Sequence, residues 1–275
     1  MPLPLPPYEI ECPAAVSSAI QVEVVNTGWV HNDWKRVVDD GRSGPIHMPL
    51  LVGVISHPDA TILVDSGLGL ATRQGSYPPF PLSLLGSHDI PAGMAMVERL
   101  AEPPAIVLMT HLHYDHVGGL LDLNAGEVWT TEADLSRYHG VGLGLSRALK
   151  TQVNWVPKRL EDGSSTRVLG RPALDVLGDG RTWYLSLPGH TPGAAAVLVQ
   201  AEDGPWLFVG DTAWVDAHLD GARRPWLTRL AVDAEPRGAH ESLQWVRQLR
   251  DECPALRVIT GHEPSLADGA RSTPP

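Results

Sequence analysis

The feature that most constrains this chain is a run of four metal-binding side chains within six residues, in the sequence Thr-His-Leu-His-Tyr-Asp-His that ends at His116. An apolar stretch at 105–110 leads into the run and predicts a buried strand. Because side chains alternate along an extended backbone, His111 and His113 can point to one side. Asp115 and His116 can then turn toward a second point. Imidazole and carboxylate groups suit zinc and similar divalent ions, so the fold must bring further ligands to the end of this strand.

Three later segments repeat one pattern: an apolar strand, then a glycine, then a residue that can bind a metal. The segments are Gly189-His190 after residues 183–187, Gly210-Asp211 after 206–209, and Gly261-His262 after 257–260. A single His or Asp at a strand end is more often structural, and a His-rich surface loop can arise by chance. Three repeats downstream of the four-residue run instead favour one shared site.

Hydrophobic patterning predicts strands interspersed with helices along most of the chain. Strands are expected at 20–25, 50–56, 61–64, 105–110, 182–187, 194–200, 206–209 and 256–260, and helices at 94–101, 131–138, 143–149 and 239–250. The turn His57-Pro58-Asp59-Ala60 predicts a hairpin. We expect one α/β (α+β) domain over residues 1–275, with two sheets covered by helices and an extended, Pro-rich lead-in at 1–15.

Taken together, these motifs resemble those of the metallo-β-lactamase-like hydrolases. The resemblance rests on His-x-His-x-Asp-His, the turn Gly-His-Thr-Pro-Gly at His190, the Gly-Asp at Asp211 and the late Gly-His at His262. Asp65, in Val-Asp-Ser-Gly after an apolar strand, resembles the early Asp of that family. The matching motifs run from about residue 62 to residue 263. The resemblance implies an αββα four-layer sandwich with its site at one edge of the two sheets.

The resemblance also implies two divalent metal ions, with zinc as the first candidate and iron, manganese or cobalt as the others. By position, one ion would take His111, His113 and His190, the other would take Asp115, His116 and His262, and Asp211 would bridge them. Asp65 would orient ligands through hydrogen bonds.

Such a centre implies hydrolysis without a covalent intermediate. Two neighbouring ions can share a hydroxide, because metal binding lowers the pKa of water from 15.7 to about 7. Asp115 is then the expected catalytic proton shuttle to the leaving group. No Ser or Cys nucleophile is required.

Within the family, the segment 110–119 and the turn at His190 resemble the acyl-homoserine lactonases. Two positions depart from that branch. Trp214 stands where those lactonases often carry a Tyr, so this position cannot supply a phenol to the oxyanion. Ala194 stands where many relatives have a second His. The sequence therefore favours opening of a small lactone or ester, of which an acyl-homoserine lactone is one candidate.

Other activities remain open on the same motifs: a thioesterase, an organophosphate hydrolase or a persulfide dioxygenase with a single iron. Gly261-His262-Glu263 is similar to a segment of hydroxyacylglutathione hydrolases, but the basic C-terminal segment that those enzymes use for glutathione is not evident. The complete second set of ligands favours two metals over one iron. A non-catalytic binding protein is expected to lack ligands, and none is missing.

Aromatic residues outside the motifs are candidates for the substrate pocket. Tyr77 and Phe80 lie in a loop rich in Gly, Pro and Ser, and Trp214 and Trp226 lie in the segment after the bridging Asp. Their rings could cover an acyl chain. For each of them, the alternative is a place in the core or in a subunit contact.

Charge and composition restrict the partners. A formal net charge of −11 repels phosphate backbones, so we exclude nucleic acid as a substrate. No window approaches the ~18 apolar residues of a membrane helix, and the first residues lack the features of a signal peptide. We expect a cytoplasmic protein that does not bind membranes and acts on a small molecule, with a homodimer left open. Cys12 and Cys253 have no nearby partner motif, so both are expected to be thiols without a role.

Overall fold

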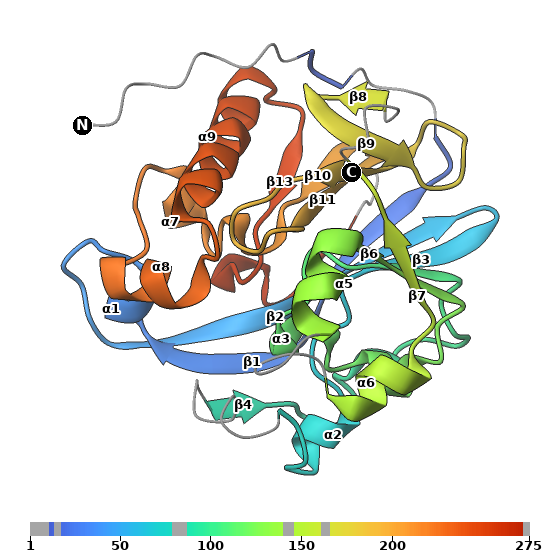
Figure 1. Cartoon of the computed structure of the whole chain (residues 1–275), viewed down its shortest axis with the longest axis horizontal. Coiled ribbons are helices and arrows are strands. Elements are labelled where there is room, and N and C mark those ends of the chain that lie inside the picture. The colour runs from blue at the N-terminus through green and yellow to red at the C-terminus, as the bar shows by residue number, and fades with distance from the viewer. Residues whose placement is uncertain (1–10, 14–17, 79–86, 140–145, 161–165, 272–275) are drawn as a thin grey trace.

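Two β-sheets pack face to face in the middle of the molecule, and helices cover their outer faces (Figure 1). The computed structural model describes residues 11–13, 18–78, 87–139, 146–160 and 166–271. This order of layers, helices on sheet on sheet on helices, confirms the predicted αββα sandwich.

The first sheet has eight strands within the described residues, in the order β14-β1-β2-β3-β5-β6-β7, with β4 paired to β1. These strands are β1 (Gln21–Asp33), β2 (Pro45–His57), β3 (Ala60–Val64), β4 (Ser87–Asp89), β5 (Ile106–Leu108), β6 (Glu127–Thr131), β7 (Trp155–Lys158) and β14 (Ala270–Arg271). The predicted hairpin turn joins β2 to β3. From β3 to β7 the paired strands are parallel, so their carboxyl ends share one edge.

The second sheet has six described strands in the order β13-β12-β11-β10-β9-β8. They are β8 (Thr166–Val168), β9 (Arg171–Asp175), β10 (Thr182–Ser186), β11 (Ala195–Ala201), β12 (Gly204–Phe208) and β13 (Arg257–Ile259). Neighbouring strands are antiparallel except β12 and β13, which are parallel and are joined through the long helix α9 (Pro236–Glu252). Parallel pairing again puts two strand ends at the same edge.

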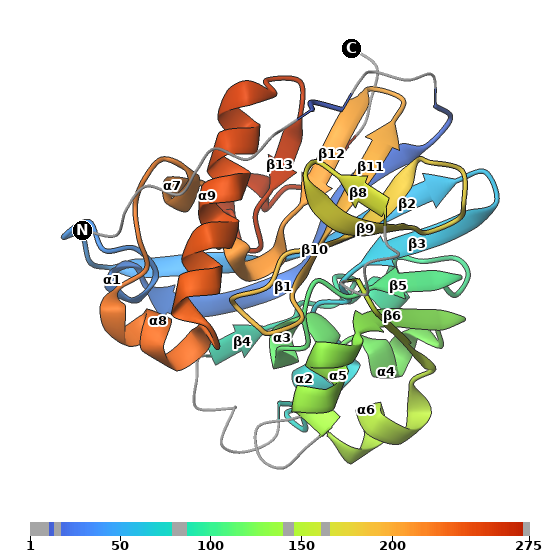
Figure 2. The same ribbon diagram turned by 45° about the horizontal axis from the view of Figure 1, so that its top comes forward.

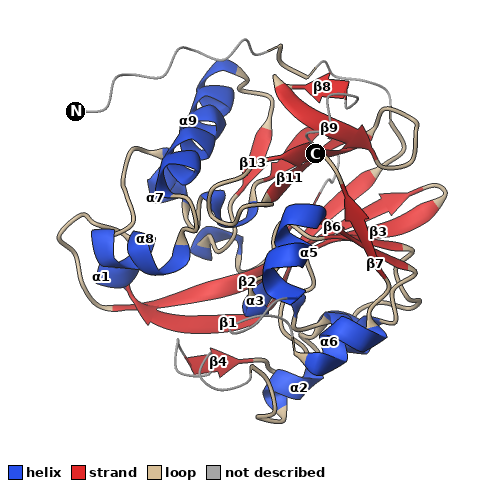
Figure 3. Cartoon of the chain, viewed as in Figure 1, coloured by secondary structure: helices blue, strands red, loops and turns tan. Residues whose placement is uncertain are grey.

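Helices lie on both outer faces (Figures 2 and 3). Besides α9, the described helices are α1 (Trp34–Val37), α2 (Leu70–Arg73), α3 (Tyr114–Val117), α4 (Leu120–Leu123), α5 (Glu132–His139), α6 (Arg147–Gln152), α7 (Asp216–Leu219) and α8 (Trp226–Val232). The described 3-10 turns are at Met96–Glu98, Gly210–Thr212 and Pro264–Leu266. Helices α7 and α9 pack on the second sheet, and α5 and α6 pack on the first. Among the described residues, no helix combines the length and the apolar character needed to cross a membrane.

Alternate residues of the second sheet face two different apolar layers. In β11, Val197 and Val199 pack between the two sheets, whereas Ala196 and Leu198 pack in the layer under α9. On the helix side, Trp245 is fully buried in that outer layer. Because side chains alternate across a strand, a strand covered on both faces must be apolar at almost every position.

Several predicted elements have different bounds in the structure. β1 and β2 extend far beyond the predicted strands, because polar residues on the outer part of the hairpin break the hydrophobic pattern. Gly28, with φ of 149°, lies at the register shift between Asn26 and Trp29 that lets β1 continue. The predicted helix at 94–101 is only a 3-10 turn. The predicted helix at 143–149 lies partly outside the described residues.

The prediction of two idle thiols is wrong, because Cys12 and Cys253 form a disulfide with Cα atoms 5.5 Å apart. The bond ties the described part of the N-terminal lead-in to the end of α9. The two cysteines are separated by 241 residues, and no local pattern can reveal such a pair. Their proximity depends on the completed fold.

Candidate metal centre

The candidate ligands meet where strand ends of both sheets come together. The run from His111 to His116 follows β5 and enters α3. His190 lies in the turn between β10 and β11, Asp211 follows β12, and His262 follows β13. In the second sheet, the parallel pairing of β12 and β13 puts Asp211 and His262 at one edge, and the antiparallel pairings on either side of β11 bring the end of β10, with His190, to the same edge. The structure therefore gathers all the predicted ligands into two neighbouring groups.

The first group consists of His111, His113, His190 and Asp211. His113 Nδ1 lies 3.1 Å from His111 Nε2 and 2.9 Å from His190 Nε2. Asp211 Oδ2 lies 3.3 Å from His190 Nε2 and 3.8 Å from His111 Nε2. Three nitrogens and one carboxylate oxygen thus converge.

The second group consists of Asp115, His116 and His262. His262 Nε2 lies 3.7 Å from Asp115 Oδ2. The remaining oxygen of Asp211, Oδ1, lies 3.3 Å from His116 Nε2 and 3.2 Å from His262 Nε2. Asp211 therefore presents one oxygen to each group.

The spacing of these donor atoms fits divalent metal ions. Zinc in proteins binds imidazole nitrogens at about 2.0–2.1 Å in a tetrahedral arrangement, which sets neighbouring donors roughly 3.3 Å apart. The separations in both groups scatter around that value. In addition, His116 Nε2 and Asp211 Oδ1 are buried and have no hydrogen-bond partner among the described residues. Because such atoms are costly to bury unpaired, they indicate a ligand between them.

The motifs, the fold and this donor set agree with a family comparison. A model described as the metallo-beta-lactamase superfamily matches residues 49–262 of the chain. The chain belongs to this superfamily. The resemblance predicted from the ligand motifs is therefore confirmed.

Relatives of the chain are named as a metallo-hydrolase and as a lactonase. The chain is 28% identical over 248 residues to a probable metallo-hydrolase of Mycobacterium tuberculosis, and this alignment covers 80% of the chain and 76% of the relative. It is 23% identical over 261 residues to an N-acyl homoserine lactonase of Azorhizobium caulinodans, and this alignment covers 86% of the chain and 90% of the relative. A solved AiiA variant of B. thuringiensis with N-decanoyl-L-homoserine at its active site shares the fold, with a TM-score of 0.72, 14% identity and coverage of 92% and 96%. The predicted class, a metal-dependent hydrolase, is confirmed.

In this metallo-β-lactamase centre, hydrogen bonds on the outer ring nitrogens aim the imidazoles inward. His190 Nδ1 lies 3.0 Å from Asp233 Oδ1, and His262 Nδ1 lies 3.0 Å from the carbonyl oxygen of Pro49. Because the outer nitrogen is engaged, Nε2 faces the ligand group. His113 differs, since its Nδ1 is the nitrogen that faces inward.

Asp65 lies behind the centre, where the sequence predicts an orienting residue. Its Oδ2 lies 2.8 Å from His116 Nδ1 and accepts a hydrogen bond from Thr110 Oγ1 at 2.7 Å. Its Oδ1 accepts from the backbone N–H of Thr110, also at 2.7 Å. The φ of Asp65 is 61°, which is uncommon outside glycine. The three contacts fix the carboxylate and, through it, the ring of His116.

Charges in the metallo-β-lactamase centre are coupled through Asp211. Burial disfavours its carboxylate, but His262 and His116 hold its pKa well below the ordinary value. Burial also disfavours the imidazolium form of His116, but Asp65 and Asp211 raise its pKa well above the ordinary value. Burial, together with the neighbouring His116, lowers the pKa of His111. The negative charge of Asp211 thus stabilises the protonated form of His116, and a divalent cation that binds here must displace that proton.

Two residues beside the centre have no motif in the sequence. Arg224 is buried, and its Nη1 donates to Asp233 Oδ1 at 2.6 Å. Asp233 is also the partner of His190 on its outer nitrogen. Arg224 follows another arginine in a loop, and Asp233 ends α8. Only the tertiary contact distinguishes them from surface charges, so sequence patterns could not single them out.

The aromatic residues predicted for the substrate pocket lie in different surroundings. Trp214 is nearly buried, and its Nε1 donates to Asp211 Oδ2 at 2.7 Å. Tyr77 packs in the core, where its hydroxyl donates to the carbonyl of the first residue of α3 at 3.0 Å. Trp226 is 64% exposed on α8. Phe80 lies outside the described residues. A role in substrate binding stays a prediction for each.

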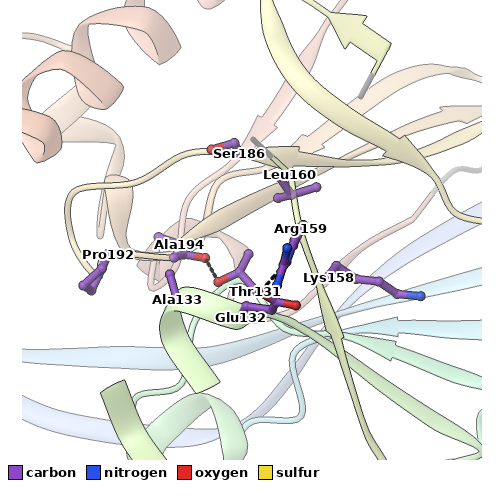
Figure 4. Close-up of a pocket in the computed structure, with 10 residues that line it drawn as sticks. Thr131, Glu132, Ala133, Lys158, Arg159, Leu160, Ser186, Pro192 and Ala194 are labelled. Carbon is purple, nitrogen blue, oxygen red and sulfur yellow. Dashed lines mark hydrogen bonds and ion pairs between the residues drawn. The ribbon is translucent and has the colours of Figure 1, made fainter. Parts of the chain in front are cut away.

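A cavity of about 400 Å³ opens beside the turn that carries His190 (Figure 4). Its wall includes Pro192 from that turn and Lys158 and Arg159 from the end of β7. Arg159 pairs with Glu132 at 2.6 Å in the same wall. Because none of the candidate ligands lines it, this cavity is separate from the metal centre.

Proposed function

We propose that this chain is a dinuclear metallohydrolase that opens a small lactone or ester. The observation that carries the proposal is the placement of Asp211, whose two oxygens face two separate groups of ligands. A carboxylate shared in this way can hold two ions a few ångströms apart. Imidazole and carboxylate donors make zinc the proposed ion, with iron, manganese and cobalt as alternatives.

Two divalent ions held by these groups would supply a hydroxide nucleophile, because a bound metal ion lowers the pKa of water from 15.7 to about 7, and they would also polarise the carbonyl of the substrate. The side chains must then move protons. Asp115 is suited to this task, because it is partly exposed and its Oδ2 lies 3.7 Å from His262 Nε2. A carboxylate in that place can take the proton that the attacking hydroxide still carries and deliver it to the leaving alkoxide.

Trp214 does not substitute for the phenol of the lactonases that the sequence resembles. Its indole N–H donates to Asp211, so it is not free to donate to an oxyanion. A centre without this additional donor supplies less stabilisation to the transition state. We therefore propose strained lactones and activated esters as the substrates, since their reactions need less of this assistance.

The choice of a lactone is supported by relatives. One of them is named an N-acyl homoserine lactonase, and it matches the chain over most of both lengths. Acyl-homoserine lactones are therefore the specific candidates. Thioesters and organophosphates are the competing substrate classes, because the same ligand set can polarise a thioester carbonyl or a phosphoryl oxygen.

The test combines metal analysis with a substrate panel. Protein purified without chelator would be analysed for metal, and wild type and His113→Ala would be compared on lactones, aryl esters, thioesters and phosphotriesters. We expect about two ions per wild-type chain and a lactone or ester activity that falls at least ~100-fold in the variant.

Two other results would change the assignment. A single iron per chain, with oxygen uptake and no hydrolysis, would replace the proposal by a persulfide dioxygenase. Two ions with hydrolysis of thioesters or phosphotriesters alone would keep the dinuclear centre and correct the substrate class.

A further inference from the structure

Trp214 forms a direct hydrogen bond with Asp211, the residue proposed to bridge the two ions. Its Nε1 donates to Asp211 Oδ2 at 2.7 Å, and the residue is only 9% exposed. The accepting oxygen is the one that faces the first group, 3.3 Å from His190 Nε2. A carboxylate oxygen has two lone pairs, so it can accept the indole N–H and still bind an ion. The contact therefore sets the direction in which Asp211 offers its remaining lone pair.

Arg224 holds the indole in this place. Its guanidinium carbon lies 4.6 Å from the centroid of the Trp214 ring. The side chain of Arg224 is buried, and its Nη2 donates to the carbonyl oxygens of Asp211 and Thr212. A guanidinium over an indole is attracted to the ring face, more strongly where water is excluded. Trp214 is thus fixed between a cation on its face and a carboxylate at its edge.

Asp233 connects this pair to the other side of the first group. Its Oδ1 accepts from Arg224 Nη1 at 2.6 Å and lies 3.0 Å from His190 Nδ1. The carboxylate neutralises a buried cation that would otherwise stand unpaired beside the metal ligands. The contacts run in a closed circuit from Asp211 through Trp214, Arg224 and Asp233 to His190, and back to Asp211.

We propose that Trp214 is a positioning residue, clamped by Arg224, that orients Asp211 toward the first group of ligands. The proposal rests on the dinuclear centre of the proposed function. The indole N–H is then bonded to Asp211, the carboxylate that would hold both ions, rather than to the substrate.

Loss of the hydrogen bond from Trp214 should affect the two groups of ligands unequally. Oδ2 of Asp211 accepts the indole N–H and faces the first group, whereas Oδ1 faces the second. Loss of the indole N–H is therefore expected to weaken the binding of an ion by the first group more than the binding of an ion by the second group. Removal of an outer contact to a metal ligand typically costs about 10–100-fold in affinity.

The direct test is Trp214→Phe, which removes the N–H and keeps an aromatic ring. Metal-free wild type and variant would be titrated with Zn²⁺ and Co²⁺ against a chromophoric chelator, and the visible spectra of the Co²⁺ forms would be compared. We expect one of the two affinities to fall about 10–100-fold, with a changed Co²⁺ spectrum. On the substrate found for the wild type, kcat is expected to fall while KM changes little.

Trp206, in the middle of β12, provides a matched control. Its Nε1 donates to Asp203 Oδ1 at 2.9 Å, and the guanidinium carbon of Arg257 lies 4.9 Å from its ring centroid. Trp206→Phe therefore removes the same kind of bond away from the ligands, and both metal affinities and the Co²⁺ spectrum should stay those of the wild type. A Trp214→Phe protein that behaves like this control would overturn the proposal.

A second variant, Arg224→Lys, decides the question if Trp214→Phe does not fold. Lysine keeps a positive charge beside Asp233 but lacks the planar guanidinium that covers the indole. The same affinity is expected to fall, by a smaller factor, and an unchanged affinity would count against the clamp. A wild type that binds fewer than two ions would contradict the proposed function instead, whatever the variants do.

Discussion

Buried histidines near the centre differ in the groups that they face. His218 bonds to the backbone, since its Nδ1 accepts from the N–H of Trp214 at 3.1 Å and its Nε2 donates to the carbonyl of Val37 at 3.0 Å. Both bonds are made by the neutral ring. Burial, followed by repulsion from Arg224, lowers the pKa of His218 to about 3. This residue therefore resists protonation in the folded protein.

We expect acid to destabilise the fold through His218. The unfolded chain takes up a proton near the ordinary pKa of 6.5, whereas the folded chain does so only near pH 3. The free energy of unfolding thus falls as pH drops through that window, by up to about 1.4 kcal/mol per pH unit from this group. His218→Gln keeps an acceptor and a donor without titrating. Urea unfolding at about pH 7 and about pH 5 should show a smaller pH effect in the variant, and equal effects would contradict the account.

The charge of Asp65 is expected to strengthen metal binding through His116. Asparagine tolerates the positive φ of this position, so Asp65→Asn should keep the backbone and remove the charge that faces His116. We expect metal affinity to fall about 10-fold, because the ring loses its charged partner. Chelator competition measures the affinity, and circular dichroism controls for the fold. An affinity equal to that of the wild type would show that orientation by the neutral amide suffices.

Among the elements, the turn at His190 depends most on its neighbours. The carbonyl oxygens of Gly189 and His190 accept backbone hydrogen bonds from Glu235 and Ala234, in the link between α8 and α9. The start of α9 approaches so closely that a Cβ on Gly189 would lie 2.0 Å from the backbone nitrogen of Ala239. The φ of Gly189 is 138°. Only glycine meets both conditions, which explains the Gly before this ligand.

Gly189→Ala should therefore displace the turn from α9. We expect the free energy of unfolding to fall by more than about 2 kcal/mol, with weaker metal binding at His190. Gly178→Ala is the control, because this glycine has φ of 79° but no atom of the described residues lies within 4 Å of an added Cβ. It should cost only about 1 kcal/mol, without an effect on metal affinity. Equal losses in the two variants would argue that backbone strain alone matters.

The same elements show what the sequence can predict. His111, Asp211 and the other ligands follow apolar strands, and this local pattern predicts one shared metal site. The αββα sandwich and the division into two groups of ligands are implied by the resemblance to the metallo-β-lactamase-like hydrolases, not by the pattern itself. Arg224 and Asp233 have no local signal, because their roles arise only when α8 packs beside the turn at His190. The indole of Trp214 was expected to line a pocket, and its bond to Asp211 depends on a side-chain orientation that no pattern encodes.

For the whole molecule, the disulfide between Cys12 and Cys253 links points 241 residues apart. We expect Cys12→Ser to lower the free energy of unfolding by about 2–5 kcal/mol, because the link restricts the unfolded chain. Denaturant unfolding with and without reductant measures this loss. Reductant should bring the wild type down to the variant and leave the variant unchanged. A wild type that does not respond to reductant would contradict the prediction.

The disulfide also bears on where the protein works. Such bonds persist in oxidising compartments and are rare in the cytosol. The cytoplasmic location expected from the sequence stays a prediction, and the disulfide weighs against it. Thiol labelling of protein taken directly from its native cells would show which state of the two cysteines is present there.

Each group of ligands draws on both halves of the sandwich. His111 and His113 come from the first sheet, whereas His190 and Asp211 come from the second, and the second group is divided in the same way. An ion in either group would bind ligands from both sheets and so link the two sheets. Because each group has ligands from both sheets, its complete set forms only when the two sheets pack together. An ion bound by either complete group would then stabilise the packed sandwich relative to a form in which the two sheets have separated.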